Sequence, residues 1–236
     1  MSRFRQSLEQ ALASSRNGAG FLTEWPIETV PEILSLLWQA YDRLKLTTLQ
    51  KVDILQADLQ LERSVSALLS DEIQVLLREQ GGFASYLVSH ERWEIETLNP
   101  EVSNRPSQYD ICFVWYAQRE LKWPCEAKVL RTDRDVAPYV ADIRDQFMPC
   151  TYGPFSSSGA MLGLLAQGNP NTALLSIEVK LGLRVATALE QAPRPHAITK
   201  LERTPPIGKG YPIAFELHHL ILHLQPQLEL PGSAPN

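Results

Sequence analysis

The sequence predicts an α+β (α/β) fold, with a mixed central β-sheet flanked by helices. Two β-branched and aromatic runs, separated by a polar turn, fill residues 106–130 and are typical of a hairpin. Apolar residues with helical spacing recur on both sides of it, over 49–80 and 136–148. Two further strand-like runs, 196–204 and 212–224, follow near the end of the chain. Helices and strands interspersed in this way pack as layers around a sheet.

The composition is that of an ordinary globular protein. With 236 residues, of which 44% are hydrophobic and 21% charged, the chain is long enough to bury a full core. No run approaches the roughly 20 apolar residues of a membrane span, and the first residues lack a signal peptide's apolar segment. Three cysteines without metal-ligand spacing are typical of small buried residues. We therefore expect a cytoplasmic protein that has no membrane partner.

The chain is expected to divide into a main domain and two smaller segments. Residues 1–48 form an N-terminal helical extension, with one short helix over 4–15 and another from Pro31, in a first helical turn, to about residue 46. The main domain covers 49–224. The Pro-rich end, 225–236, is expected to be a loose, flexible tail.

The helix expected over residues 49–80 carries a carboxylate inside its apolar face. It would be capped by a threonine just before it and end at the glycine pair 81–82. Glu62 lies in the middle of the apolar stripe, where a carboxylate is costly unless it meets a cation or a metal. The alternative is an acid at the edge of the core that reaches solvent or pairs with an arginine. The stripe itself consists of Leu55, Leu59, Val65, Leu69, Ile73 and Leu76.

The segment from residue 90 to 96 predicts an edge strand with one wet face. Trp93 and Ile95 alternate with Glu94 and Glu96, so the two acids share one side of the strand. An exposed strand face is the favoured interpretation of these acids, over a contribution to a functional site.

The hairpin places charged residues side by side. Its strands run over 111–117 and 123–130, with a turn near Arg119. Folding the chain there brings Asp110 beside the segment 126–128. Residues two apart on a strand point to one face, so Glu126 and Lys128 project together.

Two carboxylates and an ammonium group on an apolar hairpin need a physical reason. Buried charge is expensive unless it is paired or bound to metal. Two carboxylates can hold Mg²⁺, and a neighbouring lysine can orient or help to deprotonate an attacking water. The alternative is a surface ion pair of Glu126 with Lys128 or Lys122.

Asp110 followed by Glu126-Ala127-Lys128 on the next strand resembles the PD-(D/E)XK nuclease superfamily. The resemblance implies a restriction-endonuclease-like core, here with an N-terminal helical extension. It implies that Asp110 and Glu126 bind the metal, with the Ala127 carbonyl as a further ligand, and that Lys128 positions the nucleophile. The residue before Asp110 is tyrosine where the motif has proline, which is a departure from the pattern.

The resemblance also assigns roles outside the hairpin. Glu62 matches, in order and setting, the helical acid that often completes the site in this superfamily, as a ligand of a second metal or of a metal-bound water. Arg144, on the helix after the strand of Lys128, is a candidate to reach the site or a phosphate, and Arg131 is a second substrate-binding candidate. Both belong to a basic group around the hairpin, for which a solvated charged face is the alternative.

The function implied is Mg²⁺-dependent hydrolysis of phosphodiester bonds in DNA, with Mn²⁺ able to substitute. The stretch from Glu126 through 139–144 to 159–163 is similar to bacterial members of the superfamily associated with phage defence, which suggests an anti-phage effector. The alternative is a catalytically silent module that binds nucleic acid or a partner protein. RNA as substrate, a protein partner and a homo-oligomer remain open.

The rest of the chain is expected to decorate this core. The helix over 136–148 packs on the sheet, and a serine cap opens a short helix over 159–167. A further helix over 170–181 contains a second E-x-K, Glu178 and Lys180, whose side chains diverge by about 200° on a helix and so cannot replace the first. Three histidines in the last strand, His218, His219 and His223, are favoured as strand residues over metal ligands.

Overall fold

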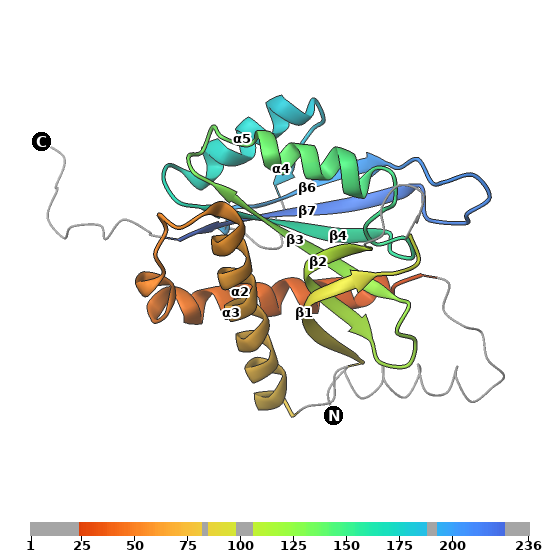
Figure 1. Cartoon of the computed structure of the whole chain (residues 1–236), viewed down its shortest axis with the longest axis horizontal. Helices are drawn as coiled ribbons and strands as arrows, with labels where there is room; N and C mark the ends of the chain where they lie inside the picture. Colours follow the sequence, from red (N-terminus) through yellow and green to blue (C-terminus); the bar gives the residue numbers. More distant parts are fainter. Residues whose placement is uncertain (1–23, 82–84, 98–105, 188–192, 225–236) are drawn as a thin grey trace, which may run out of the picture.

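The computed structural model describes residues 24–81, 85–97, 106–187 and 193–224 (Figure 1). The predicted helix over 4–15 and the predicted tail over 225–236 lie outside the described residues. In the described part of the chain the fold is α+β, with a seven-stranded mixed sheet flanked by helices. The predicted fold class is therefore confirmed.

The sheet has the strand order β1-β2-β3-β4-β7-β6-β5. The first three strands form an antiparallel meander, β3, β4 and β7 run parallel, and β6 and β5 are antiparallel to their neighbours. The strands are β1 (Tyr86–Glu94), β2 (Ser107–Trp115), β3 (Lys122–Leu130), β4 (Ser158–Leu165), β5 (Ala186–Thr187), β6 (His196–Glu202) and β7 (Ala214–His223). The predicted hairpin is thus β2 and β3.

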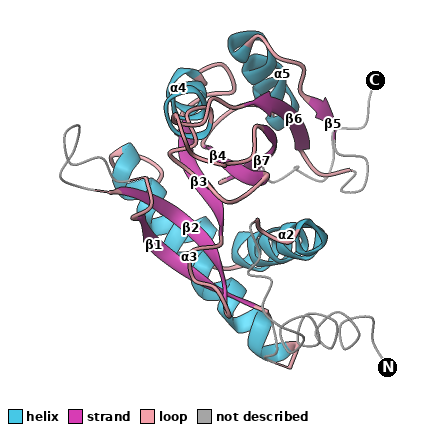
Figure 2. Ribbon diagram, turned by 90° about the vertical axis from the view of Figure 1, so that its right-hand side faces the viewer, coloured by secondary structure: helices cyan, strands magenta, loops and turns pink. Residues whose placement is uncertain are grey.

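Helices cover both faces of the sheet (Figures 1 and 2). Helices α2 (Val30–Leu46) and α3 (Asp58–Glu79) pack on one face, and α4 (Ala137–Asp142) and α5 (Pro170–Leu181) on the other. Helix α4 continues into a π-helical turn, η3 (Ile143–Phe147), and short 3-10 turns precede α2 (η1, Ile27–Thr29) and α3 (η2, Leu49–Lys51). Helix α2 belongs to the same buried core as α3 and the sheet.

Local sequence signals account for α2 and α5. Pro31 lies in the first turn of α2, where its missing N–H costs nothing. The Asn169 side chain accepts hydrogen bonds from the backbone of the first turn of α5, and Gly182 ends that helix with a φ of 74°. These two helices were predicted with nearly correct limits.

Helix α3 begins at Asp58, so the prediction of a helix from residue 49 was wrong. Leu55 lies before the helix and is 84% exposed, whereas Val65, within it, is fully buried. The Arg131 guanidinium donates to the backbone carbonyls of Ile54 and Gln56. These carbonyls are therefore satisfied by the residue that follows β3 rather than by helical amides, which is consistent with the non-helical segment before α3.

The helix predicted over residues 159–167 is instead β4, the central parallel strand. All eight of its residues are buried. A Cβ added at Gly159 would lie 2.9 Å from Pro124 Cγ and 3.0 Å from the Pro124 carbonyl oxygen, so only glycine fits beside β3 there. A short apolar run that is buried on both faces lacks the period-2 alternation by which strands are recognised, so its pattern was ambiguous.

The β1–β2 ribbon bends sharply at Glu91 and Asp110. Their register is continuous except at these two opposed positions, and Glu91 has a φ of 52°. Glu94 stands opposite the first residue of β2, yet its carboxylate lies 2.9 Å from the ammonium of Lys122, which pairs with the next-to-last residue of β2. A straight strand would separate those two ends of β2 by roughly 23 Å. Asp110 therefore lies at the bend.

Candidate active site

The site forms where β2 and β3 separate. Their ladder ends at the pair Ile111–Cys125, and the next position on β2 is Asp110. The Asp110 carboxylate accepts a hydrogen bond from the backbone N–H of Ala127 at 2.8 Å. A side chain thus takes the place of the next ladder bond, and the carboxylate is held against the open edge of β3.

Glu62 closes the same edge from α3. The backbone N–H of Val129 donates to Glu62 Oε1 at 3.0 Å. Backbone amides two residues apart on a strand point to the same side. The carboxylates of Asp110 and Glu62 therefore accept from neighbouring N–H groups on the edge of β3 that is no longer paired with β2. The carboxylate inside the apolar stripe of the helix is explained by this contact, because a buried acid needs partners.

Lys128 is held by two carboxylates from opposite faces of the sheet. Its Nζ lies 3.4 Å from Glu62 Oε2 on α3 and 2.9 Å from Asp142 Oδ2 on α4. Burial alone would lower the pKa of Lys128, but the hydrogen bond to Asp142 and the charges of Glu62, Asp142 and Glu126 raise it above its ordinary value. Lys128 is therefore an ammonium ion at neutral pH.

Asp142 was not predicted as a site residue. It lies three residues after the buried Tyr139, so helical spacing places both near one side of α4. The sequence contains a second acid nearby, Asp145, which is exposed, and nothing local distinguishes the two. Only the packing of α4 against β3 selects Asp142.

Glu126 is a buried acid with one carboxylate oxygen, Oε2, left without a hydrogen-bond partner in the described part of the chain. Its side chain is 8% exposed. Burial, and then the negative charge of Asp110, raise its pKa well above the ordinary value. The Tyr152 hydroxyl donates to the carbonyl of Gln108 at 2.8 Å and is close enough to lower the pKa of Glu126 in part.

Among the three predicted acids, the negative charge of one raises the pKa of another. Burial, and then the negative charge of Glu62, raise the pKa of Asp110 to about 6, against the opposing hydrogen bond from Ala127. The charge of Asp110 likewise raises the pKa of Glu126. Folding thus gathers an acidic cluster, defined here as Glu62, Asp110, Glu126 and Asp142 around Lys128.

Two members of the acidic cluster, Asp110 and Glu126, are the candidates to bind a divalent ion. Within the described ranges, no group of three or more His, Cys, Asp and Glu side chains is arranged to hold a metal ion. Glu62 and Asp110 each already use one oxygen on the backbone of β3. However, Mg²⁺ is usually held by one or two carboxylates together with waters and substrate phosphates. The orphaned, buried oxygen of Glu126 beside Asp110 fits that mode of binding.

The two arginines proposed to bind substrate have partners within the chain. Arg144 Nη2 donates to the carbonyl of Lys180, at the end of α5, at 2.9 Å. Arg131 Nε donates to Asp58 Oδ1 at 2.7 Å, besides holding the segment before α3. In the described part of the chain neither side chain bonds to the acidic cluster, so a phosphate contact by either one remains a prediction.

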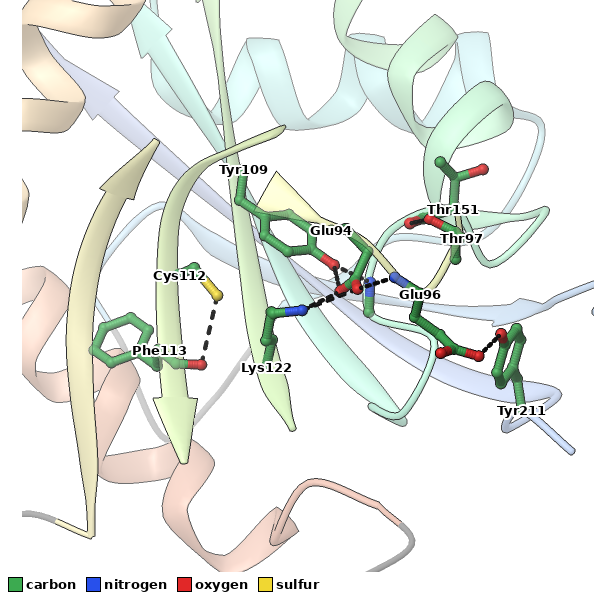
Figure 3. Close-up of polar contacts among 10 residues, drawn as sticks. Glu94, Glu96, Thr97, Tyr109, Cys112, Phe113, Lys122, Thr151 and Tyr211 are labelled. Carbon is green, nitrogen blue, oxygen red and sulfur yellow. Dashed lines mark hydrogen bonds and ion pairs between the residues drawn. The ribbon is translucent and has the colours of Figure 1, made fainter. Parts of the chain in front are cut away.

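Glu94 was expected on an exposed face, and this was wrong. Its side chain is fully buried, whereas Trp93 is 43% exposed. The carboxylate of Glu94 binds the Lys122 ammonium at 2.9 and 3.0 Å and accepts from the Tyr109 hydroxyl at 2.6 Å (Figure 3). The bend at Asp110 turns the end of β1 toward the protein interior. Glu94 is therefore buried and Trp93 exposed, the reverse of what the alternation predicted. The buried ion pair of Glu94 and Lys122 joins the end of β1 to the start of β3.

The histidines lie on strands, as predicted, and are bonded among themselves and to neighbours. His219 contacts the Tyr139 hydroxyl through Nδ1 and Thr199 through Nε2, both at 2.9 Å. His196 Nε2 lies 3.2 Å from His218 Nδ1. The contact with Tyr139 joins the sheet to α4, and the other two join β6 to β7 within the sheet. None of them involves the acidic cluster.

Comparisons with protein-family models, with curated proteins and with solved structures found no match to this chain. None of the helices in the described part of the chain combines the length and apolarity that crossing a membrane requires. The candidate site is therefore defined by its own geometry.

Proposed function

We propose that the protein is a metal-dependent nuclease of PD-(D/E)XK type that hydrolyses phosphodiester bonds in DNA. The observation that carries the proposal is the buried, unpartnered oxygen of Glu126 beside Asp110, at the point where β2 and β3 separate. A buried carboxylate left without a partner is costly, and a bound cation would remove that cost. The presence of Lys128 and Glu62 in the same cluster supports the proposal, because the motif contains this lysine and a helical acid often completes the site in the superfamily.

In this proposal Asp110 and Glu126 hold Mg²⁺, for which Mn²⁺ substitutes. The bound ion would supply Lewis-acid stabilisation of the phosphate and lower the pKa of a water. Lys128 presents an ammonium group, which orients the attacking water and offsets negative charge that develops on the phosphate. Glu62 keeps that ammonium and the edge of β3 in place.

The proposal is tested by incubating purified protein with plasmid and single-stranded DNA, with and without Mg²⁺ or Mn²⁺. Metal-dependent cleavage is expected, together with its loss in Lys128→Met and Glu126→Gln. The matched controls are Glu178→Gln and Lys180→Met, which alter the second E-x-K on α5 and should leave cleavage unchanged. Cleavage that persists in Lys128→Met, or that needs no divalent ion, would refute the assignment.

A specific observation favours a second candidate, a silent module that binds nucleic acid or a partner protein. Asp110 and Glu62 already have a structural task, since they close the open edge of β3, and Lys128 is paired with two carboxylates of the chain itself. The two candidates differ in metal dependence. Binding of DNA or of a partner that survives Glu126→Gln, without divalent ions and without cleavage, would support the module.

The biological setting stays a proposal of the same kind. Resemblance of the stretch after Glu126 to phage-defence proteins of the superfamily suggests that foreign DNA is the substrate. Cells expressing the protein should then resist phage infection, and cells expressing the Lys128→Met variant should not. Equal plaque counts for the two would remove this role while leaving the nuclease proposal in place.

A further inference from the structure

We infer that Asp142 is a positioning residue, which together with Glu62 fixes the Lys128 ammonium inside the acidic cluster. The inference rests on the proposed nuclease function, in which the place of that ammonium decides how the attacking water is oriented. Of the two carboxylates that bind Nζ, Asp142 is the nearer, at 2.9 Å against 3.4 Å. Nothing in the motif assigns a role to this position.

The arrangement of the two anchors restricts the amine more than one anchor would. Glu62 approaches from α3 and Asp142 from α4, and these helices lie on opposite faces of the sheet (Figure 2). A lysine has four rotatable side-chain bonds, so a single contact leaves its end free to move. Contacts from two sides select one position and keep the ammonium within the field of Glu126.

Glu62 and Asp142, the two carboxylates that bind Lys128, differ in their other contacts. Glu62 also accepts from the backbone of Val129, so its loss would disturb the strand as well as the lysine. Within the described residues, Asp142 bonds through its carboxylate to Lys128 alone. Replacing Asp142 therefore changes the position of the amine without removing a contact to the β3 backbone.

The local backbone of α4 singles out the same residue. Asp142 is the last α-helical residue before the π-helical turn η3. Such turns widen a helix by one residue and occur often at functional sites, because they re-aim the side chains next to them. The place of the turn, directly after the residue that contacts Lys128, is a second observation in favour of a functional Asp142.

The activity test compares Asp142→Ala, Asp142→Asn and Asp142→Glu with the wild-type protein. If Asp142 positions Lys128, the first two should lose on the order of 10²-fold in kcat, the usual effect of a misplaced catalytic group, while KM for DNA stays within a few-fold. Asp142→Glu, which keeps the carboxylate, should recover part of the loss. Asp145→Ala, an exposed acid on the adjoining turn, is the matched control. Wild-type kcat in Asp142→Ala would overturn the inference and leave the nuclease proposal standing.

A second measurement needs no activity. Urea midpoints are compared for Asp142→Ala, Lys128→Met and the double variant. If the two side chains hold each other, their shifts will not add, and the second substitution will cost less in the background of the first. Additive shifts would overturn the inference. Should the wild-type protein fail to cleave DNA, the nuclease proposal fails, and this cycle alone then decides whether Asp142 positions Lys128.

Discussion

The carboxylate of Asp110 and the backbone N–H of Ala127 meet at 2.8 Å across the gap where β2 leaves β3. In a regular hairpin, that N–H would bond to a backbone carbonyl. The bend of the β1–β2 ribbon at Asp110 removes the carbonyl and leaves the carboxylate in its place. Asp110 therefore has a structural task besides the chemical one that the nuclease proposal gives it, and substitutions can separate the two.

Replacing Asp110 by alanine should destabilise the protein by about 1–3 kcal/mol, since the buried N–H of Ala127 loses its acceptor. Replacing it by asparagine should cost little or even stabilise, because the amide oxygen can still accept and the repulsion with Glu126 disappears. Both substitutions should abolish metal-dependent cleavage. Urea denaturation measures the first effect and the DNA assay the second. Equal destabilisation by the two variants would contradict the structural role.

Divalent ions should stabilise the wild-type protein if Asp110 and Glu126 hold one. At 10 to 100 times the dissociation constant, Mn²⁺ adds about 1.4–2.7 kcal/mol to the free energy of unfolding. Thermal unfolding with increasing Mn²⁺ should therefore show a rising midpoint. Glu126→Gln should remove the rise, whereas Glu178→Gln should keep it. A rise of the same size in all three proteins would point to nonspecific binding.

The buried pair of Glu94 and Lys122 should be expensive to break from one side. Glu94→Met leaves a buried ammonium without its partner and should cost about 3–5 kcal/mol. The double variant Glu94→Met/Lys122→Met should be more stable than the single one, because no buried charge remains unpaired. Chemical denaturation of both variants tests this. A single variant as stable as the wild type would show that the pair does not stabilise the fold.

Gly159 and Gly163 distinguish the observed strand β4 from the helix predicted there. In an exposed helix, glycine to alanine would stabilise by about 1 kcal/mol. In β4, a Cβ at Gly163 would lie 2.7 Å from Ile221 Cδ1, and one at Gly159 would meet the backbone of Pro124. Both alanine variants should therefore destabilise by about 1–3 kcal/mol, with Gly159→Ala the worse because backbone yields less than a side-chain end. A stabilised variant would contradict the strand.

Three buried histidines should make the fold sensitive to acid. Burial lowers the pKa of His219 and His196 to about 3 and that of His218 to about 4. Unfolded imidazoles titrate near 6.5, so below that pH the unfolded chain binds more protons than the folded one. The free energy of unfolding should then decrease as the pH is lowered from about 6.5 to 4, by up to about 1.4 kcal/mol per histidine and pH unit. Unfolding free energies measured across this pH range, together with NMR titration of the three imidazoles, test the predicted loss of stability. A histidine of this group that titrates near 6.5 in the folded protein would contradict the burial.

Some elements were predictable because short stretches of the chain decide them. The β-branched and aromatic composition of the two runs within residues 107–130, with the polar turn between them, specifies β2 and β3. Pro31, Asn169 and Gly182 mark helix ends through contacts within a few residues. The spacing rule that put Glu126 and Lys128 on one face of a strand follows from backbone geometry alone.

Other features depend on contacts between residues far apart in the sequence. β4 is a strand because it lies between β3 and β7, and its uniform apolar run fits either a buried helix or a buried strand. Glu94 is buried because the paired strands β1 and β2 bend together at Glu91 and Asp110, and this pairing cannot be seen in the sequence. Arg131 and Arg144 look free in the sequence, but each binds backbone carbonyls of another element.

The sequence by itself determined the hairpin, the limits of α2 and α5 and the choice of Glu62, Asp110, Glu126 and Lys128 as unusual charges, since each rests on local spacing or on the cost of burying charge. Only the tertiary structure decided that Asp142 joins them, and that Asp110 and Glu62 also close the edge of β3. The physical reason is that the apolar residues around a charge in the sequence show that its burial is costly. The group that compensates the charge is far away in the sequence and is brought to it only by folding.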